Sequence, residues 1–185
     1  MSGMPEVLPT PDPSPRSSGL PWSRPGILVG VDGSECSMDA LRYAVDLAGP
    51  LGLPVHAMAV WDYPVLLFGE YTTPYGAESL AMEAERVLDA AEQAVFAGST
   101  PEWFSASNHR GQVARELVEA SKDAAMLVVG SRGHGGFTGL LIGSVGLACV
   151  THAHCPVLVF RYATASEAEA SHPQEGTEYG HRNGL

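Results

Sequence analysis

The sequence predicts an α/β fold with an open, mostly parallel five-stranded sheet and helices on both faces. Two observations lead to this prediction. Short apolar runs alternate with segments of helical periodicity throughout residues 26–162, as in parallel sheets whose strands are joined by helices. The apolar run at 126–129 is followed by a glycine-rich segment that begins at Gly130. Such segments join a strand to a helix at the anion-binding sites of this fold class.

The first half of this region contains two strands and two helices. Residues 27–31 form a short apolar strand, and Ser34 is a favourable N-cap for the helix that follows it. Gly49-Pro50 is expected to end that helix. Residues 55–60 form the second strand, and apolar side chains at helical spacing over 80–95 predict the second helix.

The second half adds three strands and two helices. A more polar strand is expected at 102–107, and a short helix with one apolar face at 111–122. The run 126–129 is the fourth strand, and Ser144 begins a fourth helix that extends to residue 152. Residues 157–161 form the last strand, which completes the strand–helix alternation of a parallel sheet.

The two ends of the chain differ from this central region in composition. Residues 1–25 hold seven of the fourteen prolines, interspersed with serine and glycine, and predict a flexible arm. Residues 163–185 have no apolar periodicity and predict a flexible tail. A single domain is therefore expected at 26–162.

Charge and cysteine content exclude several classes of protein. The formal net charge is −11, which disfavours nucleic acids and anionic membranes as partners. Lys122 is the only lysine and does not follow a glycine run, which excludes a Walker-type phosphate loop. The three cysteines have no paired spacing, which favours a reducing compartment. The sequence also has no apolar stretch of membrane-spanning length and no signal-peptide pattern. We therefore expect a cytoplasmic protein.

Three segments are expected to meet at the carboxyl ends of the strands, where open parallel sheets bind ligands. They are Asp32, Val60 and the segment 130–144. Glycines and backbone N–H groups at the start of the fourth helix suit phosphates. Asp32 suits a ribose hydroxyl or a phosphate-bound metal, and the backbone of Val60 suits a base. The pattern predicts a site for a mononucleotide.

These residues make the chain resemble the universal stress protein family. Gly130, Gly133, Gly143 and Ser144 match that family's nucleotide motif, G-x2-G-x9-G-[S/T], at the correct spacing. Val31-Asp32-Gly33-Ser34 resembles the end of the family's first strand, and Cys155-Pro156-Val157-Leu158-Val159 resembles its last strand. The resemblance covers residues 26–162 and implies a Rossmann-like sheet of the adenine nucleotide α-hydrolase type.

The resemblance also implies a function. Family members with the full motif bind ATP, so ATP with a divalent ion (Mg or Mn) is expected here, in a stress-response regulator with weak or no hydrolysis. ADP, AMP and a cyclic nucleotide stay open as alternatives. The family implies a homodimer through the last strand, and an unidentified protein partner. The nucleotide contacts that it implies are Asp32, Val60, Gly130, Arg132, Gly133, Gly143, Ser144 and Val145.

Two other functions remain open. One is an enzyme of the adenine nucleotide α-hydrolase type that acts on a small substrate, although no residue pattern indicates a catalytic group or a second pocket. The other is a structural dimer that binds nothing, which the intact spacing of the glycines disfavours because an unused loop has no need of all four motif positions. We also expect Gly146 to weaken the fourth helix, residues 62–76 to move on binding, and His109 to lie at the surface.

Overall fold

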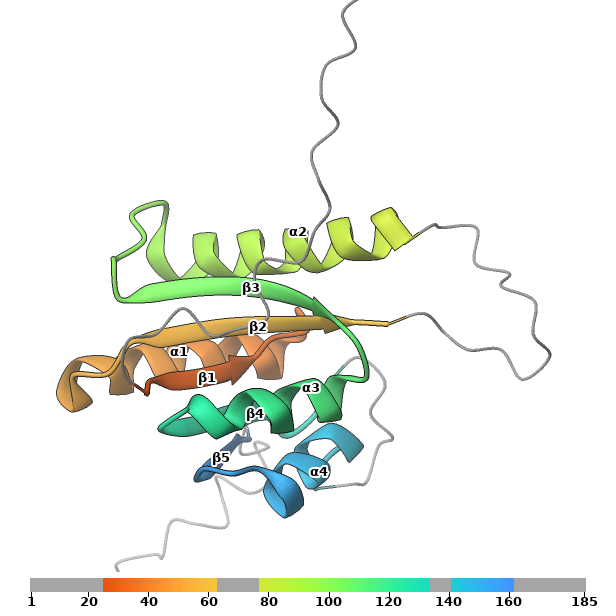
Figure 1. The fold of residues 1–185 in the computed structure, drawn as a ribbon. Helices are drawn as coiled ribbons and strands as arrows, with labels where there is room; N and C mark the ends of the chain where they lie inside the picture. The colour runs from red at the N-terminus through yellow and green to blue at the C-terminus, as the bar shows by residue number, and fades with distance from the viewer. Residues whose placement is uncertain (1–24, 63–76, 134–140, 162–185) are drawn as a thin grey trace, which may run out of the picture.

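The computed structural model describes residues 25–62, 77–133 and 141–161, which form a parallel five-stranded sheet with two helices on each face (Figure 1). The expected fold class is confirmed. The elements are β1 Ile27–Gly30, α1 Glu35–Leu51, β2 Val55–Trp61, α2 Ala77–Phe96, β3 Phe104–Arg110, α3 Val113–Ala120, a 3-10 turn η1 Ser121–Asp123, β4 Met126–Gly130, α4 Ser144–His152 and β5 Val157–Phe160.

The strand order β3-β2-β1-β4-β5 places a topological switch point between β1 and β4. The chain runs outward from β1 through β2 to β3, and then returns to β4 on the other side of β1 (Figure 1). All four ladders between neighbouring strands are parallel. Connections therefore leave β1 and β4 in opposite directions, which opens a crevice at their carboxyl ends.

Alternate residues of the central strands are buried on opposite faces of the sheet. Ile27 and Val29 of β1 pack with α1 and α2, whereas Leu28 between them packs with α3 and α4. This period of two, with apolar residues on both faces, is typical of a strand that is covered on both sides. The central strands, whose carboxyl ends border the crevice, are thus buried on both faces.

The first helix extends past the residues expected to end it. Gly49-Pro50 lies within α1, which ends at Leu51. The actual end is Gly52, which has a φ of +62° and donates its N–H to the Gly49 carbonyl oxygen, while Leu53 N–H donates to Ala48 oxygen. These two bonds form a Schellman motif. The left-handed glycine ends the helix, and the last turn tolerates the proline.

The third strand and third helix also differ from the expected ranges. β3 begins at Phe104 instead of residue 102, because Phe104 N–H donates to Pro101 oxygen in a turn. It continues to Arg110, since its polar end pairs with β2 as far as Trp61. α3 begins only at Val113, because the extended residue Gly111, with a φ of +156°, still bonds Trp61 oxygen through its N–H.

Several expectations fall on residues outside the described ranges. These include the flexible arm, the flexible tail and nearly all of the segment 62–76. Within the described ranges, no helix combines the length and the apolarity needed to span a membrane.

A histidine is buried in the face of the sheet that packs against α3 and α4. His56 of β2 is 1 % exposed, and its Nδ1 and Nε2 lie 2.8 Å and 2.7 Å from the hydroxyls of Ser105 and Ser107. Burial, with a smaller contribution from His109, lowers the pKa of His56 from 6.5 to about 4. His56 is therefore neutral at pH 7.

This burial predicts loss of stability in acid. Because the pKa of His56 is lower in the folded protein, the unfolded chain takes up the proton first, and stability is lost as the pH falls from 6.5 toward 4. The contribution is about 3 kcal/mol over that range, from ~1.4 kcal/mol per unit. Urea unfolding at pH 7.0 and 4.5 should show a smaller loss for His56→Gln than for the wild type.

His152→Gln is the matched control, because His152 lies exposed at the end of α4. This variant should lose as much stability in acid as the wild type. An equal loss in His56→Gln would show that His56 does not determine the acid sensitivity.

Candidate functional site

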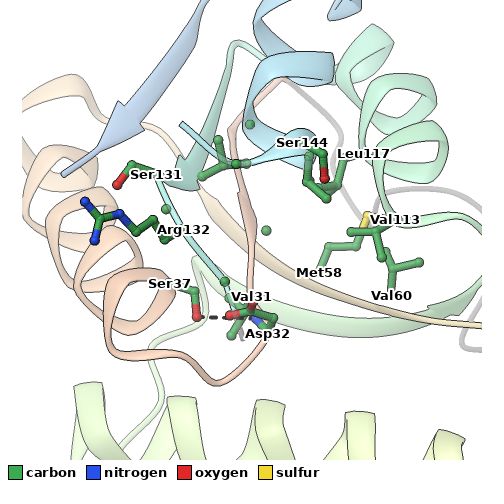
Figure 2. Close-up of a pocket in the computed structure, with 17 residues that line it drawn as sticks. Val31, Asp32, Ser37, Met58, Val60, Val113, Leu117, Ser131, Arg132 and Ser144 are labelled. Atoms are coloured by element: carbon green, nitrogen blue, oxygen red, sulfur yellow. Dashed lines mark hydrogen bonds between the residues drawn. The ribbon is translucent and has the colours of Figure 1, made fainter. Parts of the chain in front are cut away.

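A cavity of about 490 Å³ opens at the carboxyl ends of β1, β2 and β4. It is lined by all eight predicted site residues, together with parts of α1, α3 and α4 (Figure 2). The predicted site residues are Asp32, Val60, Gly130, Arg132, Gly133, Gly143, Ser144 and Val145. Segments more than a hundred residues apart in the chain thus meet at one pocket, at the switch point of the sheet.

One end of the pocket is formed by the start of α4. Gly143 is the N-cap and, lacking a side chain, caps none of the first-turn N–H groups. Its own N–H donates to Ser131 oxygen at 2.7 Å. The first N–H groups of a helix have no partner within it, and Ser144, Val145 and Gly146 all line the pocket. This end is suited to an anion.

Asp32 is exposed at the mouth of the pocket and is oriented by the start of α1. Its Oδ1 accepts hydrogen bonds from the Ser34 N–H at 3.0 Å and the Ser34 hydroxyl at 2.6 Å. Its own N–H donates a weak hydrogen bond, 3.3 Å long, to the Ser37 hydroxyl oxygen (Figure 2). Oδ2 lies against Gly133, so closely that a Cβ at that glycine would collide with it. The carboxylate therefore lies between the loop after β1 and the 130–133 segment.

The backbone of Val60 lies beyond the end of the β1–β2 ladder. That ladder ends at Gly30 and Met58, and Met58 oxygen accepts the Val31 N–H at 2.9 Å. In a parallel sheet, alternate residues direct their N–H and C=O groups to the same neighbouring strand. Val60 therefore directs both groups toward the side where β1 has turned away. A donor and an acceptor side by side can recognise the edge of a base.

An apolar wall faces the glycine-lined part of the pocket. Met58 and Val60 of β2 and Val113 and Leu117 of α3 contribute its side chains (Figure 2). Sequence reasoning missed Met58, Val113 and Leu117 as site residues. The helical spacing of Val113 and Leu117 predicted an apolar face on α3, but spacing alone does not distinguish a core face from one that lines a cavity.

Arg132 lines the pocket, but its side chain does not point toward the start of α4. Figure 2 shows its side chain extending toward α1, away from Ser144 and the apolar wall. A contact between the guanidinium and a phosphate at the start of α4 requires this exposed side chain to turn.

Two of the motif glycines have packing reasons of their own. A Cβ at Gly130 would lie 3.0 Å from the carbonyl carbon of Cys36 and 3.1 Å from Ser37 nitrogen, in the first turn of α1. A Cβ at Gly133 would strike Asp32. An empty loop of this shape would therefore also require Gly130 and Gly133, whereas a Cβ at Gly143 would make only an ordinary contact, 3.5 Å from Ser131 oxygen.

Gly146 also has a packing reason. A Cβ there would lie 3.0 Å from Cγ1 of Ile142, so glycine lets Ile142 pack against the first turn of α4. Gly146 is buried and lines this end of the pocket without a side chain.

Acidic and metal-binding groups are sparse in this region. Asp32 is the one acidic side chain among the described residues that line the pocket. In the described ranges, no three His, Cys, Asp or Glu side chains gather closely enough to hold a metal ion. A divalent ion in the pocket would therefore depend on its ligand's own oxygens, with Asp32 as the available carboxylate.

Residues 25–161 match the model of the Universal stress protein family. Among curated proteins, Universal stress protein Rv2623 of Mycobacterium tuberculosis is 37 % identical over 138 residues, which cover 73 % of this chain and 44 % of the relative. Universal stress protein Rv2624c from the same species is 33 % identical over 135 residues, 73 % of this chain and 47 % of the relative. The chain thus spans less than half the length of these two relatives.

Solved structures of the same family share the fold. Universal stress protein UspA from Lactobacillus plantarum superimposes with a TM-score of 0.57 at 25 % identity, over 75 % of this chain and 99 % of that one. A universal stress protein in complex with cAMP gives 0.54 at 22 %, over 77 % and 100 % of the two chains. The Archaeoglobus fulgidus protein in complex with dAMP gives 0.50 at 24 %, over 74 % and 98 %. The family match over nearly the whole described region, together with the identity to these relatives, establishes that the chain belongs to the universal stress protein family.

Proposed function

We propose that this protein binds ATP, accompanied by a divalent ion, in the pocket at the switch point, and that it acts as a nucleotide-dependent stress-response regulator in the cytoplasm. The observation that carries the proposal is the convergence of all eight predicted site residues on one cavity. An ordinary turn would account for some of the glycines, but it would not bring Asp32 and Val60 to the same cavity.

The pocket has separate regions that suit the base, the ribose and the phosphates of a nucleotide. Met58, Val60, Val113 and Leu117 offer an apolar surface for a base, and the backbone of Val60 supplies polar groups at its edge. Asp32, at the mouth, suits a ribose hydroxyl. The uncapped start of α4 suits phosphates, since its N–H groups and helix dipole favour negative charge.

Two related structures favour an adenine nucleotide over other ligands. One universal stress protein has been solved with cAMP, and the Archaeoglobus fulgidus protein with dAMP. Both ligands carry a single phosphate. We favour ATP here because two backbone segments, 131–133 and 143–146, line the pocket beyond the base, and together they can accommodate several phosphates.

Hydrolysis is expected to be slow or absent. Asp32 is the only acidic side chain among the described pocket residues, and Ser34 holds one of its oxygens through two hydrogen bonds. No other described side chain in the lining is a general base for water. Binding energy is then available to shift the conformation of the protein rather than to cleave the nucleotide.

We also propose a homodimer through β5, an edge strand of the sheet. Leu127 N–H donates to Pro156 oxygen and Ser131 N–H donates to Phe160 oxygen, so the even-numbered residues of this strand face β4. Val157 and Val159 then direct their N–H and C=O groups to the open edge. An apolar edge strand with such groups exposed favours pairing with a second strand.

Replacement of Gly133 tests the nucleotide site. In Gly133→Ala the new Cβ displaces the Asp32 carboxylate, and ATP affinity should fall at least tenfold, equivalent to about 1.4 kcal/mol. Isothermal titration calorimetry with ATP and magnesium measures the affinity. Gly49→Ala is the matched control, because a Cβ at Gly49 meets no atom within 4 Å. Equal affinities in both variants would contradict the site.

Replacement of Val159 tests the dimer. Val159→Pro removes an N–H that faces the open edge and leaves the β4–β5 bonds intact, so the protein should become monomeric with little change in melting temperature. Leu158→Pro, which removes an N–H that faces β4, should instead lower the melting temperature. Light scattering after size exclusion measures the mass, and a dimeric Val159→Pro protein would argue against pairing through β5.

A further inference from the structure

A chain of four polar side chains lies on one face of the neighbouring strands β2 and β3, next to the pocket. His56 lies between the hydroxyls of Ser105 and Ser107, and the Ser107 hydroxyl also lies 2.8 Å from Nε2 of His109. Ser107 is buried, whereas Ser105 and His109 are half-buried. His109 was expected at the surface ahead of a helix, but it belongs to β3, where its side chain takes part in this chain.

The chain borders the apolar wall of the pocket. In the ladder between β2 and β3, Ser107 is the partner of Met58, and His109 is the partner of Val60. Met58 and Val60 both line the pocket. His109 is thus the immediate neighbour, on the edge strand, of the residue proposed to recognise the base.

His109 also faces the helix that completes this wall. Glu116 of α3 interacts electrostatically with His109, and its side chain lies over Gly111, where a Cβ would come within 2.8 Å of its Cγ and Cδ. In the sequence of α3, Glu116 lies between Val113 and Leu117, the two residues that this helix contributes to the pocket. A change in the electrostatic attraction between His109 and Glu116 therefore acts on the helix that carries those two side chains.

The charge on His109 constrains the direction of the hydrogen bonds in the chain. The Ser107 hydroxyl has one proton and meets two imidazole nitrogens, so it donates to one and accepts from the other. When His109 is protonated, its Nε2 must donate to Ser107. Ser107 then donates to Nε2 of His56, and Nδ1 of His56 must carry the ring proton toward Ser105. When His109 is neutral, both directions are open.

The structure itself favours the neutral form of His109. Burial lowers the pKa of His109 from 6.5, and the negative charge of Glu116 opposes that shift. The titratable groups that face His109 from the described elements around it are Glu116 on α3 and His56 on β2. Arg110, the adjacent residue, instead extends over the ring of Trp61, with its guanidinium carbon 6.0 Å from the ring centroid.

We propose that His109 makes nucleotide binding dependent on pH: neutral His109 holds β3 and α3 in the arrangement that forms the apolar wall, and protonated His109 draws Glu116 toward itself and disturbs that wall. The inference rests on the proposed nucleotide site. By linkage, a ligand that requires the neutral arrangement must weaken proton binding at His109, and a proton must weaken ligand binding by the same factor.

The inference is tested by NMR titration of the histidine ring protons, with and without ATP and magnesium. Saturating nucleotide should shift the titration midpoint of His109 downward by half a unit or more. Glu116→Gln should lower the midpoint of His109 in the free protein, because the carboxylate favours the charged ring.

Affinity measurements give the reciprocal readout. ATP affinity should fall about threefold more between pH 7.5 and 5.5 in the wild type than in His109→Gln, and His152→Gln should behave as the wild type. Comparison of variants at each pH cancels titration of the terminal phosphate, which occurs in the same range.

The possible failures are distinguishable. If ATP shifts the amide signals of Gly133, Gly143 and Ser144 but leaves the midpoint of His109 unchanged, the nucleotide site stands and the coupling to His109 is overturned. If ATP shifts no signal at any pH, the nucleotide site and the coupling are both overturned.

Discussion

The pocket depends on the close approach of the end of β4 to the first turn of α1. Gly130 lies so near Cys36 and Ser37 that only a residue without a Cβ fits without displacing the backbone. This approach brings Ser131 and Gly133 beside the loop that follows β1. Ser131 is buried there, donates its N–H to Phe160 oxygen of β5 and accepts the Gly143 N–H with its own oxygen. A single residue thus connects the edge strand, the start of α4 and the pocket.

The fold and the approximate site could be predicted because both depend on local signals. Apolar runs of strand length and helical periodicity specify the elements, and the alternation of the two specifies a parallel sheet. In such a sheet the carboxyl ends of neighbouring strands share one edge, so Asp32, Val60 and the glycines after β4 were expected together. The cavity that they line lies at that edge. The ends of helices and strands were harder to predict. For α1, both Gly49 and Gly52 could end the helix, and only the structure shows that Gly52 does.

The apolar wall and the histidine chain could not be predicted, because both depend on tertiary packing. Val113 and Leu117 have the spacing of an ordinary core face, and only the placement of α3 beside the crevice makes them part of the pocket. His56 and His109 lie more than fifty residues apart, on strands whose register no local signal specifies. The direction of the Arg132 side chain is likewise a property of the folded surface.

The most direct test of the nucleotide site is the nucleotide content of the purified protein. The protein is denatured, and the released small molecules are identified and quantified by mass spectrometry. Refolded or nucleotide-stripped protein is then titrated with ATP and magnesium. We expect an adenine nucleotide at about one per chain, or saturable binding of added ATP at one site per chain. A protein that releases no nucleotide and fails to bind ATP with magnesium would contradict the proposed nucleotide site.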